Sequence, residues 1–401
     1  MRFLIPFLFA ALASTAAFVS AHTADQQQQQ QVKRATTCNG HAELCGKGFG
    51  NVTFLGTHNS YAVGKEVADN QGWNVTEQLN DGIRLLQVQT HLLNREINLC
   101  HSSCSLQSSG PLSNYLSTLS TWLAANPTEI VTLLITNPES IPPSTFGQDF
   151  VAAGLDKLAY SPASTATSRD EWPTLGAMID QGKRLVVFMD YNADFGAVPY
   201  IIDEFSNVFE DAYDTTSQDF PCTVNRTSGS PETTLMLTNH YLDYTTTIFG
   251  LQVFLSDKSN LTTTNSASGY GSIGQGVANC VDQWKRNPNF VLVDWYDSNG
   301  NTPFDLVASL NGVAAPTNTV KTSELTSGTS SSSSSSSAAS RTGSKAATSG
   351  TTKATGTTTA SAGNVSSSSL SAAPASLRIP AIGTLVVTLL GTALGVAWVA
   401  M

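Results

Sequence analysis

Two histidines follow apolar, strand-like runs in this sequence. Residues 52–61 read "VTFLGTHNSY", so His58 comes directly after an apolar run that ends in Gly-Thr. Residues 85–104 read "LLQVQTHLLNREINLCHSSC", which places His101 between two cysteines after another apolar run. Imidazole changes its charge near neutral pH, so it is suited to passing protons. Two histidines facing one pocket could split a phosphodiester, one as the base towards an attacking hydroxyl and one as the acid towards the leaving oxygen.

Such a pair needs other groups around it. A carboxylate beside one histidine would fix its tautomer and raise its basicity, and Asp294 and Asp190 both end apolar runs where they could do so. The charge of the transition state also calls for an arginine, a lysine or a metal ion. A lone histidine after a strand is more often structural, and we assign structural roles to His91 and His240. A serine hydrolase is excluded, because the sequence has no GxSxG motif.

The elements that would position these residues alternate between strands and helices. Short apolar runs with little polar alternation predict buried parallel strands at 52–55, 84–89, 130–136, 184–190, 234–238 and 290–295. Helices are predicted at 74–82, 112–125, 170–181 and 198–209, and the glycine-rich 269–276 is interpreted as a loop. This order favours an α/β fold, a TIM-like (β/α) barrel with one folded domain.

Polar side chains gather where the predicted strands end. A barrel places functional residues at the carboxyl ends of its strands. Besides the histidines and Asp294, this rule selects five candidates for substrate binding, namely Asn59, Gln87, Gln89, Trp295 and Tyr296.

Both ends of the chain differ from the predicted domain at 35–312. Residues 1–21 resemble a secretory signal peptide, and the Gln-rich 22–34 ends in a Lys-Arg pair that favours removal as a propeptide. Residues 313–376 are rich in Ser, Thr and Ala, which predicts a disordered, O-glycosylated stalk. The apolar 377–401 favours a GPI-attachment signal over a tail-anchored helix, with attachment near Gly363 or Asn364.

The cysteines and sequons fit secretion. We expect three disulfides, Cys38–Cys45 and Cys100–Cys104 by proximity and Cys222–Cys280 by elimination, among fifteen connectivities. A zinc site would need paired CxxC spacing, which is missing. Sequons predict N-glycosylation in exposed loops at Asn51, Asn74, Asn225, Asn260 and Asn364. The net charge of −10 argues against nucleic-acid binding.

Five short motifs together resemble one family. "FLGTHNSY", "GIRLLQVQTH", "LCHSSC", "NPTEIVTLLIT" and "NFVLVDWYD" are similar, in order and spacing, to the PLC-like phosphodiesterases built on the X domain of phosphatidylinositol-specific phospholipase C, and most of all to secreted fungal members with a GPI signal. The resemblance implies a distorted TIM barrel with His58 as base and His101 as acid. It places Asn59 where bacterial members carry an aspartate, and Asp294 at the late strand-end carboxylate.

The sequence departs from that family after its second strand. Members acting on phosphatidylinositol carry an acidic residue there, followed by a cation or a metal ligand, whereas this chain reads "QVQ" with Gln87 and Gln89. We expect these amides to donate to the phosphate instead. Arg84 should point away from the rim, while Arg95 and Lys183 are candidates for the missing charge. No cofactor or metal site is predicted, and calcium and magnesium stay open.

The sequence therefore predicts a phosphoric diester hydrolase or lyase acting on a phospholipid or glycolipid headgroup. An inositol hydroxyl or water would attack the phosphorus. The alternative is a noncatalytic cell-surface or cell-wall protein that uses the barrel as a binding scaffold, which the "QVQ" segment favours. In either case we expect a secreted, GPI-anchored monomer.

Overall fold

The computed structural model describes residues 34–248 and 250–323 of the 401-residue chain. The predictions for residues 1–33 and 324–401, including the signal peptide, most of the stalk, the apolar tail and the attachment site at Gly363 or Asn364, lie outside the described residues. Within the described ranges, no helix combines the length and apolarity needed to cross a membrane.

Eight parallel strands form a curled sheet in the order β7-β6-β5-β2-β1-β12-β9-β8. Their bounds are β1 Phe54–Thr57, β2 Leu85–Leu93, β5 Val131–Thr136, β6 Leu185–Met189, β7 Ile201–Asp203, β8 Val208–Glu210, β9 Leu235–Asn239 and β12 Phe290–Val293. All six predicted strands are present, since their Val-, Leu- and Phe-rich runs are buried on both faces. The fold is the predicted TIM-like α/β barrel, but its sheet stays open because β7 and β8 are not paired.

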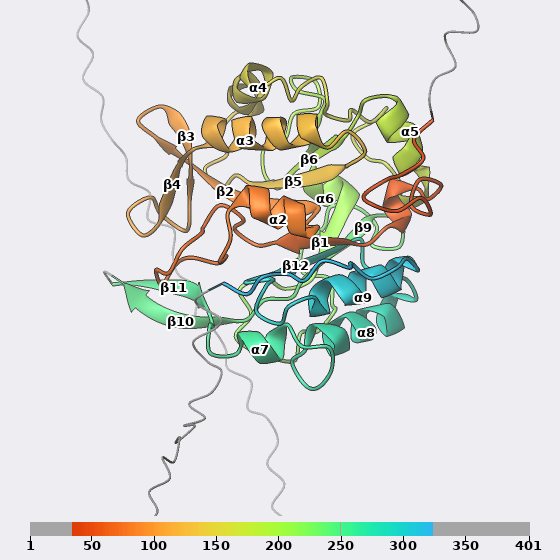
Figure 1. The fold of residues 1–401 in the computed structure, drawn as a ribbon. Helices are drawn as coiled ribbons and strands as arrows, with labels where there is room; N and C mark the ends of the chain where they lie inside the picture. The colour runs from red at the N-terminus through yellow and green to blue at the C-terminus, as the bar shows by residue number, and fades with distance from the viewer. Residues whose placement is uncertain (1–33, 249, 324–401) are drawn as a thin grey trace, which may run out of the picture. The chain divides into compact units, whose positions relative to one another are not determined.

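Two pairs of strands project from the same side of the barrel (Figure 1). The first consists of β3 Glu96–Cys100 and β4 Ser108–Pro111, and β3 also pairs with the end of β2. The second is the hairpin of β10 Asp243–Ile248 and β11 Leu251–Ser256. The sequence analysis predicted none of these four strands.

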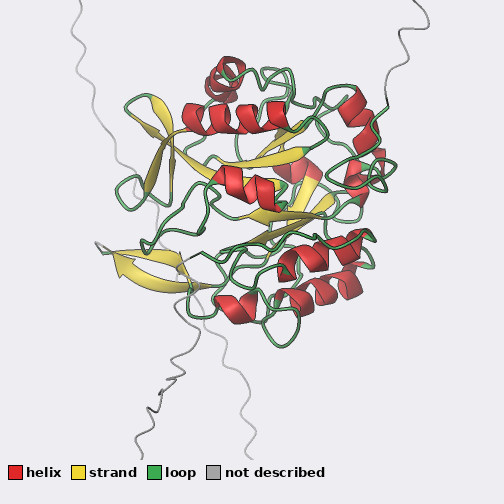
Figure 2. Ribbon diagram, viewed as in Figure 1, coloured by secondary structure: helices red, strands yellow, loops and turns green. Residues whose placement is uncertain are grey.

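Helices cover the outside of the sheet (Figure 2). They are α2 Val75–Asp81, α3 Leu112–Ala125, α4 Pro143–Ala152, α5 Leu175–Asp180, α6 Glu204–Asn207, α7 Leu261–Thr264, α8 Ile273–Trp284 and α9 Thr302–Asn311, with 3₁₀ turns η1 Phe49–Asn51 and η2 Arg169–Glu171.

Three local predictions were wrong or incomplete. The predicted helix 198–209 is strand β7, a single helical turn α6 and strand β8, because these apolar residues complete the two edges of the sheet. The predicted helix 170–181 is interrupted at Pro173, so only α5 is α-helical. The predicted loop 269–276 contains the start of α8, whose first turn is capped by Ser272 accepting from the backbone N–H of Gln275.

The sheet separates two buried layers. One apolar cluster combines outward-facing strand residues such as Leu55 and Leu133 with the inner faces of the helices. The other fills the barrel interior, where the ring of Phe54 packs against those of Phe49 and Phe290 at 5.1 and 5.9 Å. The aromatic rings close one end of the barrel and leave the carboxyl ends of the strands open for a site.

The disulfides join the expected pairs, Cys38–Cys45, Cys100–Cys104 and Cys222–Cys280. Of the sequons, Asn51, Asn74 and Asn225 are exposed. The amide nitrogen of Asn260 is half-buried and donates to Asp257 at 2.7 Å, so this sequon is the least accessible of the four described. Glycosylation itself stays a prediction.

The folded chain continues past the expected boundary at Gly312. Val320 is buried, the indole of Trp73 donates to the carbonyl of Lys321 at 2.7 Å, and the backbone N–H of Ser323 donates to Asp297. Residues 313–323 are therefore a strap packed on the barrel and not the start of the stalk.

Ending the chain at Gly312 is expected to destabilise the barrel relative to ending it at Ser323. The shorter chain loses the buried Val320 side chain and several hydrogen bonds, including that from the backbone N–H of Val320 to Asn301, together at least about 2–4 kcal/mol. Urea unfolding of the two chains measures the difference. Equal midpoints and slopes would show that the strap contributes nothing to stability.

Candidate active site

A cavity of about 440 Å³ opens at the carboxyl ends of the barrel strands. Leu134 and Leu292, which belong to the interior core, form its floor. The loop after β3 contributes one wall through Ser103 and Leu106, and the β10–β11 hairpin contributes another through Phe254. The predicted site residues His58, His101, Asn59, Gln87 and Gln89 all line this cavity.

The pairing of β1 with β12 sets the position of His58. Thr57 is the register partner of Val293, so the next residue on each strand, His58 and Asp294, lies at the same edge. Nδ1 of His58 is 3.0 Å from Oδ1 of Asp294. A neutral His58 therefore donates from Nδ1 and keeps a lone pair on Nε2.

Amide side chains hold this pair in place. Asn70 donates to Oδ2 of Asp294 at 3.0 Å, and Gln71 donates to the carbonyl oxygen of His58 at 2.7 Å. The amide of Asn59 lies 3.0 Å from Nε2 of His58. The other face of the imidazole stacks on Tyr241, with ring centroids 3.9 Å apart and planes at 7°. His58 is thus fixed on several sides, and Nε2 of the neutral ring accepts from the Asn59 amide, a contact that a substrate hydroxyl would have to replace.

His101 approaches the same cavity from the loop between β3 and β4. Its ring centroid is 6.4 Å from that of His58, at an interplanar angle of 81°. Nδ1 of His101 donates to the carbonyl oxygen of Ala68 at 2.7 Å, which leaves Nε2 as the nitrogen that exchanges protons with a ligand. The two rings face one cavity, as the sequence analysis proposed.

The environment moves the two pKa values apart. Burial works to lower the pKa of His58, but the charge of Asp294 and its hydrogen bond outweigh burial, and the pKa ends above 6.5. Burial lowers the pKa of His101 below 6.5, and the hydrogen bond to Ala68 offsets only part of this. Without a ligand, a shared proton therefore prefers His58.

Gln87 and Gln89 brace the loops of the site. Oε1 of Gln87 accepts from the backbone N–H of Asn59 at 2.6 Å, and its amide nitrogen donates to Thr136 at 2.9 Å. Oε1 of Gln89 accepts from the backbone N–H of Ser102 at 2.8 Å. Their contacts thus hold the segments that carry the two histidines.

The structure does not place Trp295 and Tyr296 in the cavity wall, so our prediction that they bind substrate was wrong. Both side chains are fully buried. The Trp295 ring faces the ammonium of Lys258 at 4.5 Å, and the hydroxyl of Tyr296 donates to Asp81 at 2.7 Å, on the helix side of the sheet. After β12 the chain turns sharply, with φ of +37° at Trp295, so alternation along the strand no longer predicts direction.

The remaining candidates lie away from the cavity. Asp190 accepts from the backbone N–H groups of Asn137 and Tyr191, so Asp294 is the carboxylate beside His58. His91 lies beside Glu139 at 2.8 Å. His240 lies 3.0 Å from the carbonyl of Thr264, and burial lowers its pKa to about 4.

Arg226 is the basic residue that lines the cavity, and the sequence analysis did not identify it. Arg84 pairs with Glu129 away from the cavity, and neither Arg95 nor Lys183 lines it. The guanidinium of Arg226 lines the cavity and pairs with Glu210 at 2.8 Å. Arg226 comes from the long β8–β9 connection, where no motif marked it.

Carboxylates surround this guanidinium. Burial and the neighbouring Glu210 raise the pKa of Glu204 well above its ordinary value, which favours the protonated form of Glu204. Burial also raises the pKa of Asp214, which lines the same wall. The charge of the guanidinium is thus offset by its ion pair with Glu210.

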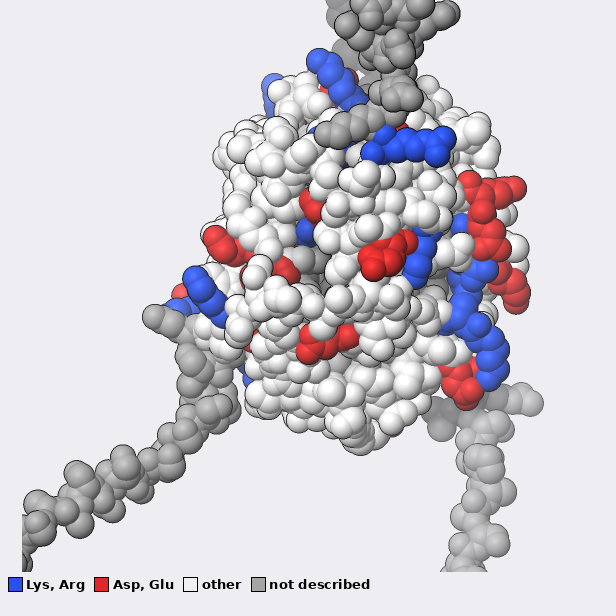
Figure 3. All heavy atoms as spheres, turned by 45° about the vertical axis from the view of Figure 1, so that its right-hand side comes forward, with Lys and Arg blue, Asp and Glu red and all other residues white. Residues whose placement is uncertain are grey.

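In the described part of the chain, one group of potential metal ligands lies close together: Asp211, Cys222 and Cys280. Both cysteine sulfurs are in a disulfide. These residues do not suit a calcium or magnesium ion, which prefers oxygen ligands. On the face drawn in Figure 3, basic and acidic side chains are interspersed and form no broad basic area.

Comparisons with known proteins show the family of the chain. The family model described as PI-PLC X 1 matches residues 44–310. An uncharacterised secreted protein of Arthroderma benhamiae is 40% identical over 302 residues, covering 73% of this chain and 68% of the relative. A PI-PLC X domain-containing protein 1 of the same fungus is 43% identical over 262 residues, covering 64% and 84%.

Among solved structures, the phosphatidylinositol-specific phospholipase C of Listeria monocytogenes shows a TM-score of 0.43 at 12% identity, over 67% of this chain and 97% of that chain. The fold assignment rests on the strand order described above and the family on the match over residues 44–310. The chain belongs to the PI-PLC X domain family.

Proposed function

We propose that this protein cleaves a phosphodiester in a phospholipid or glycolipid headgroup, with His58 as the general base and His101 as the general acid. The observation that carries the proposal is the pair of imidazoles in one cavity, with ring centroids 6.4 Å apart. Asp294 lies beside Nδ1 of His58. A serine or cysteine nucleophile plays no part in it.

In the first step, Nε2 of His58 removes the proton of an attacking hydroxyl, and that oxygen forms a bond to phosphorus. The bond from phosphorus to the leaving oxygen breaks, and protonated His101 donates its Nε2 proton to that oxygen. An inositol hydroxyl as the nucleophile would leave a cyclic phosphate, and water would leave a monoester. Either product leaves His58 protonated and His101 neutral, so a proton must return before the next turnover.

This cycle needs the proton on His101, which binds a proton less well than His58 does when no ligand is present. The pKa of His58 is raised and that of His101 is lowered. A bound phosphate anion favours the charged form of any nearby imidazole, so binding would raise the pKa of His101. Substrate binding thus helps to create the active protonation state.

Arg226 is the proposed phosphate-side donor. Its pairing with Glu210 limits the net charge that it offers, so hydrogen bonds from a fixed guanidinium carry more of the stabilisation than long-range attraction. Asn59, Gln87 and Gln89 are proposed as supports of the site, because their side chains form hydrogen bonds within the protein.

The binding-scaffold alternative keeps one observation in its favour. Gln87 and Gln89 stand where family members carry charges, and the charge of Arg226, which lines the cavity, is offset by its ion pair with Glu210. In both functions we propose a lipid or glycolipid headgroup as the ligand, at a cell surface to which a GPI anchor tethers the protein. One relative's name includes the word secreted, in line with this location.

Replacing each histidine separately tests the assigned roles. His58→Ala should lower turnover of a phosphoinositide at least about 100-fold, and His101→Ala should do the same. With an aryl phosphodiester, whose phenolate leaves without a proton, His101→Ala should recover to within about tenfold of the unmodified protein while His58→Ala stays inactive. Initial rates on both substrates make the comparison.

His91→Ala is the matched control, because His91 is a histidine outside the cavity. Recovery of His58→Ala instead of His101→Ala on the aryl substrate would reverse the two roles. A folded protein that turns over neither substrate would favour the binding scaffold.

Asp294→Asn should lower the pKa of His58. An opposite charge within about 4–6 Å favours the protonated imidazole by about 1–3 pKa units, and the variant removes that charge. The upper limb of the pH–rate profile should move to lower pH with it. An NMR titration of the His58 ring measures the pKa, and Asp190→Asn, which changes a carboxylate away from the cavity, should leave it unchanged. An unchanged pKa in Asp294→Asn would contradict the electrostatic role of the pair.

Arg226→Gln should lower kcat/KM about 100-fold and reduce the free energy of unfolding by about 3–5 kcal/mol, because it removes a donor and leaves buried carboxylates uncompensated. Arg84→Gln breaks a comparable pair with Glu129 away from the cavity. It should lower stability similarly and leave kcat/KM within about threefold. Equal kinetic losses in the two variants would mean that Arg226 acts only through stability.

A further inference from the structure

His101 belongs to a five-residue ring closed by a disulfide. Strand β3 ends at Cys100, and the bond to Cys104 closes the turn within a sequence separation of 4. The ring carries the imidazole into the cavity, and the loop rejoins the sheet at β4.

The turn has little apolar anchorage of its own. Ser102, Ser103 and Ser105 are exposed, and Leu106 is only partly buried. Ser102 has a left-handed backbone with φ of +58°, a conformation that costs free energy for a residue with a side chain. Without other restraints, a polar turn of this kind would sample many conformations.

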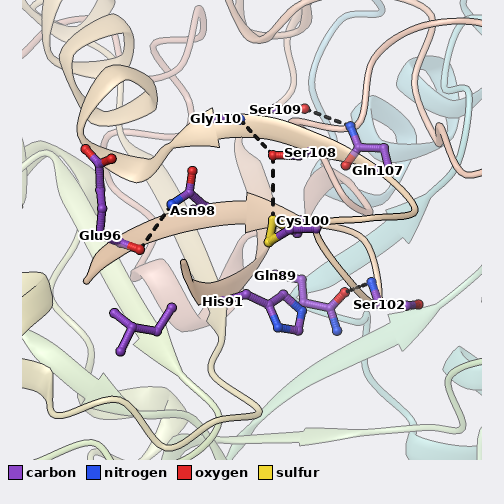
Figure 4. The surroundings of a disulfide bond; sticks show 12 residues. Gln89, His91, Glu96, Asn98, Cys100, Ser102, Gln107, Ser108, Ser109 and Gly110 are labelled. Carbon is purple, nitrogen blue, oxygen red and sulfur yellow. Dashed lines mark hydrogen bonds between the residues drawn. A yellow bond between two sulfur atoms is a disulfide. The ribbon is translucent and has the colours of Figure 1, made fainter. Parts of the chain in front are cut away.

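Besides the disulfide and backbone hydrogen bonds such as that from the N–H of His101 to the carbonyl of Gln107, two contacts to other segments hold it. The backbone N–H of Ser102 donates to Oε1 of Gln89 at 2.8 Å, a contact visible in Figure 4, and Nδ1 of His101 donates to Ala68 at 2.7 Å. Figure 4 also shows Cys100 next to Ser108 of β4, which ties the start of the turn to the neighbouring strand. Gln89, the last residue of β2 that pairs with β5, thus joins this strand to the residue that follows His101.

We propose that the Cys100–Cys104 disulfide and Gln89 form one positioning device that holds His101 in proton-transfer geometry. This inference rests on the proposed function. In this proposal Gln89 does not bind phosphate. Its amide oxygen accepts from the backbone N–H of Ser102, in the turn that carries His101.

The position of His101 matters because the rate of proton donation depends on distance. Proton donation requires the imidazole to lie within hydrogen-bond distance of the leaving oxygen, and a displacement of about 1 Å can cost about 100-fold in rate. A covalent ring and a fixed acceptor restrict the turn before substrate arrives. Losing them leaves the barrel folded but spreads His101 over positions from which it cannot donate.

The test compares two disulfides in the full chain. Cys100→Ser with Cys104→Ser should lower kcat for a phosphoinositide about 30- to 100-fold, with KM within about threefold. Cys38→Ser with Cys45→Ser removes another short disulfide, outside the cavity, and should leave kcat within about threefold. The loss in the first variant should shrink to less than about fivefold on an aryl phosphodiester, as in His101→Ala, because that substrate needs no acid.

Gln89→Met removes the acceptor at nearly constant volume and should lower kcat about three- to tenfold. In the protein without the Cys100–Cys104 bond it should add less than about twofold, since both changes release the same turn. If the loss of kcat in the combined variant equals the product of the separate losses, Gln89 and the disulfide act independently, and the proposal of a single device is wrong. Equal losses on the lipid and aryl substrates would overturn it as well, since damage to the whole site predicts that result.

A readout without turnover separates this inference from the proposed function. In protein with isotope-labelled histidine, the unmodified chain should show one set of His101 ring signals with a hydrogen-bonded Nδ1–H and cross-relaxation to His58. The variant lacking the Cys100–Cys104 bond should lose both features, whether or not the protein is an enzyme. Their retention would contradict the positioning role even if no substrate is ever turned over.

Discussion

The parallel register between β1 and β12 is the constraint on which the site depends. These strands lie far apart in the sequence, yet the pairing of Thr57 with Val293 brings the next residues, His58 and Asp294, within 3.0 Å of each other. A slip of one residue would turn one of the two side chains to the other face of the sheet. The same pairing positions the backbone groups that Gln71 contacts, so the orientation of His58 follows from the sheet itself.

The second histidine depends on a different kind of support. His101 follows β3, a strand outside the parallel path, and its place is set by a disulfide-closed turn and by Gln89 of β2. One proton-transfer group is therefore fixed by the barrel, and the other by a short loop on a projecting pair of strands. The loop wall and the β10–β11 wall enclose a cavity whose polar lining is chemically mixed, with one guanidinium among several carboxylates.

Much of the barrel could be predicted from sequence because its strands are continuous apolar runs. The same signal failed at 198–209, where three-residue strands on either side of one helical turn are too short to show a period. His58 and Asp294 were predictable because each directly follows an apolar run that is a strand of the barrel. His101 follows β3, which was not predicted, and the signal for it was its place between two cysteines in a motif that resembles the family. Trp295 and Tyr296 follow the same rule, but the backbone turns after Asp294 and buries both. Arg226 and Glu204 could not be found, because a long connection and a misassigned helix carry them into the cavity.

The most direct measurement is phosphorus NMR of the products when the protein is incubated with a panel of phosphodiester lipids, phosphatidylinositol among them. The account predicts release of a headgroup phosphate, with a cyclic phosphodiester signal if an inositol hydroxyl attacks or a monoester signal if water does. Binding of the same lipids by a folded protein, with unchanged phosphorus spectra over hours, would contradict phosphodiester cleavage and leave the barrel as a binding scaffold.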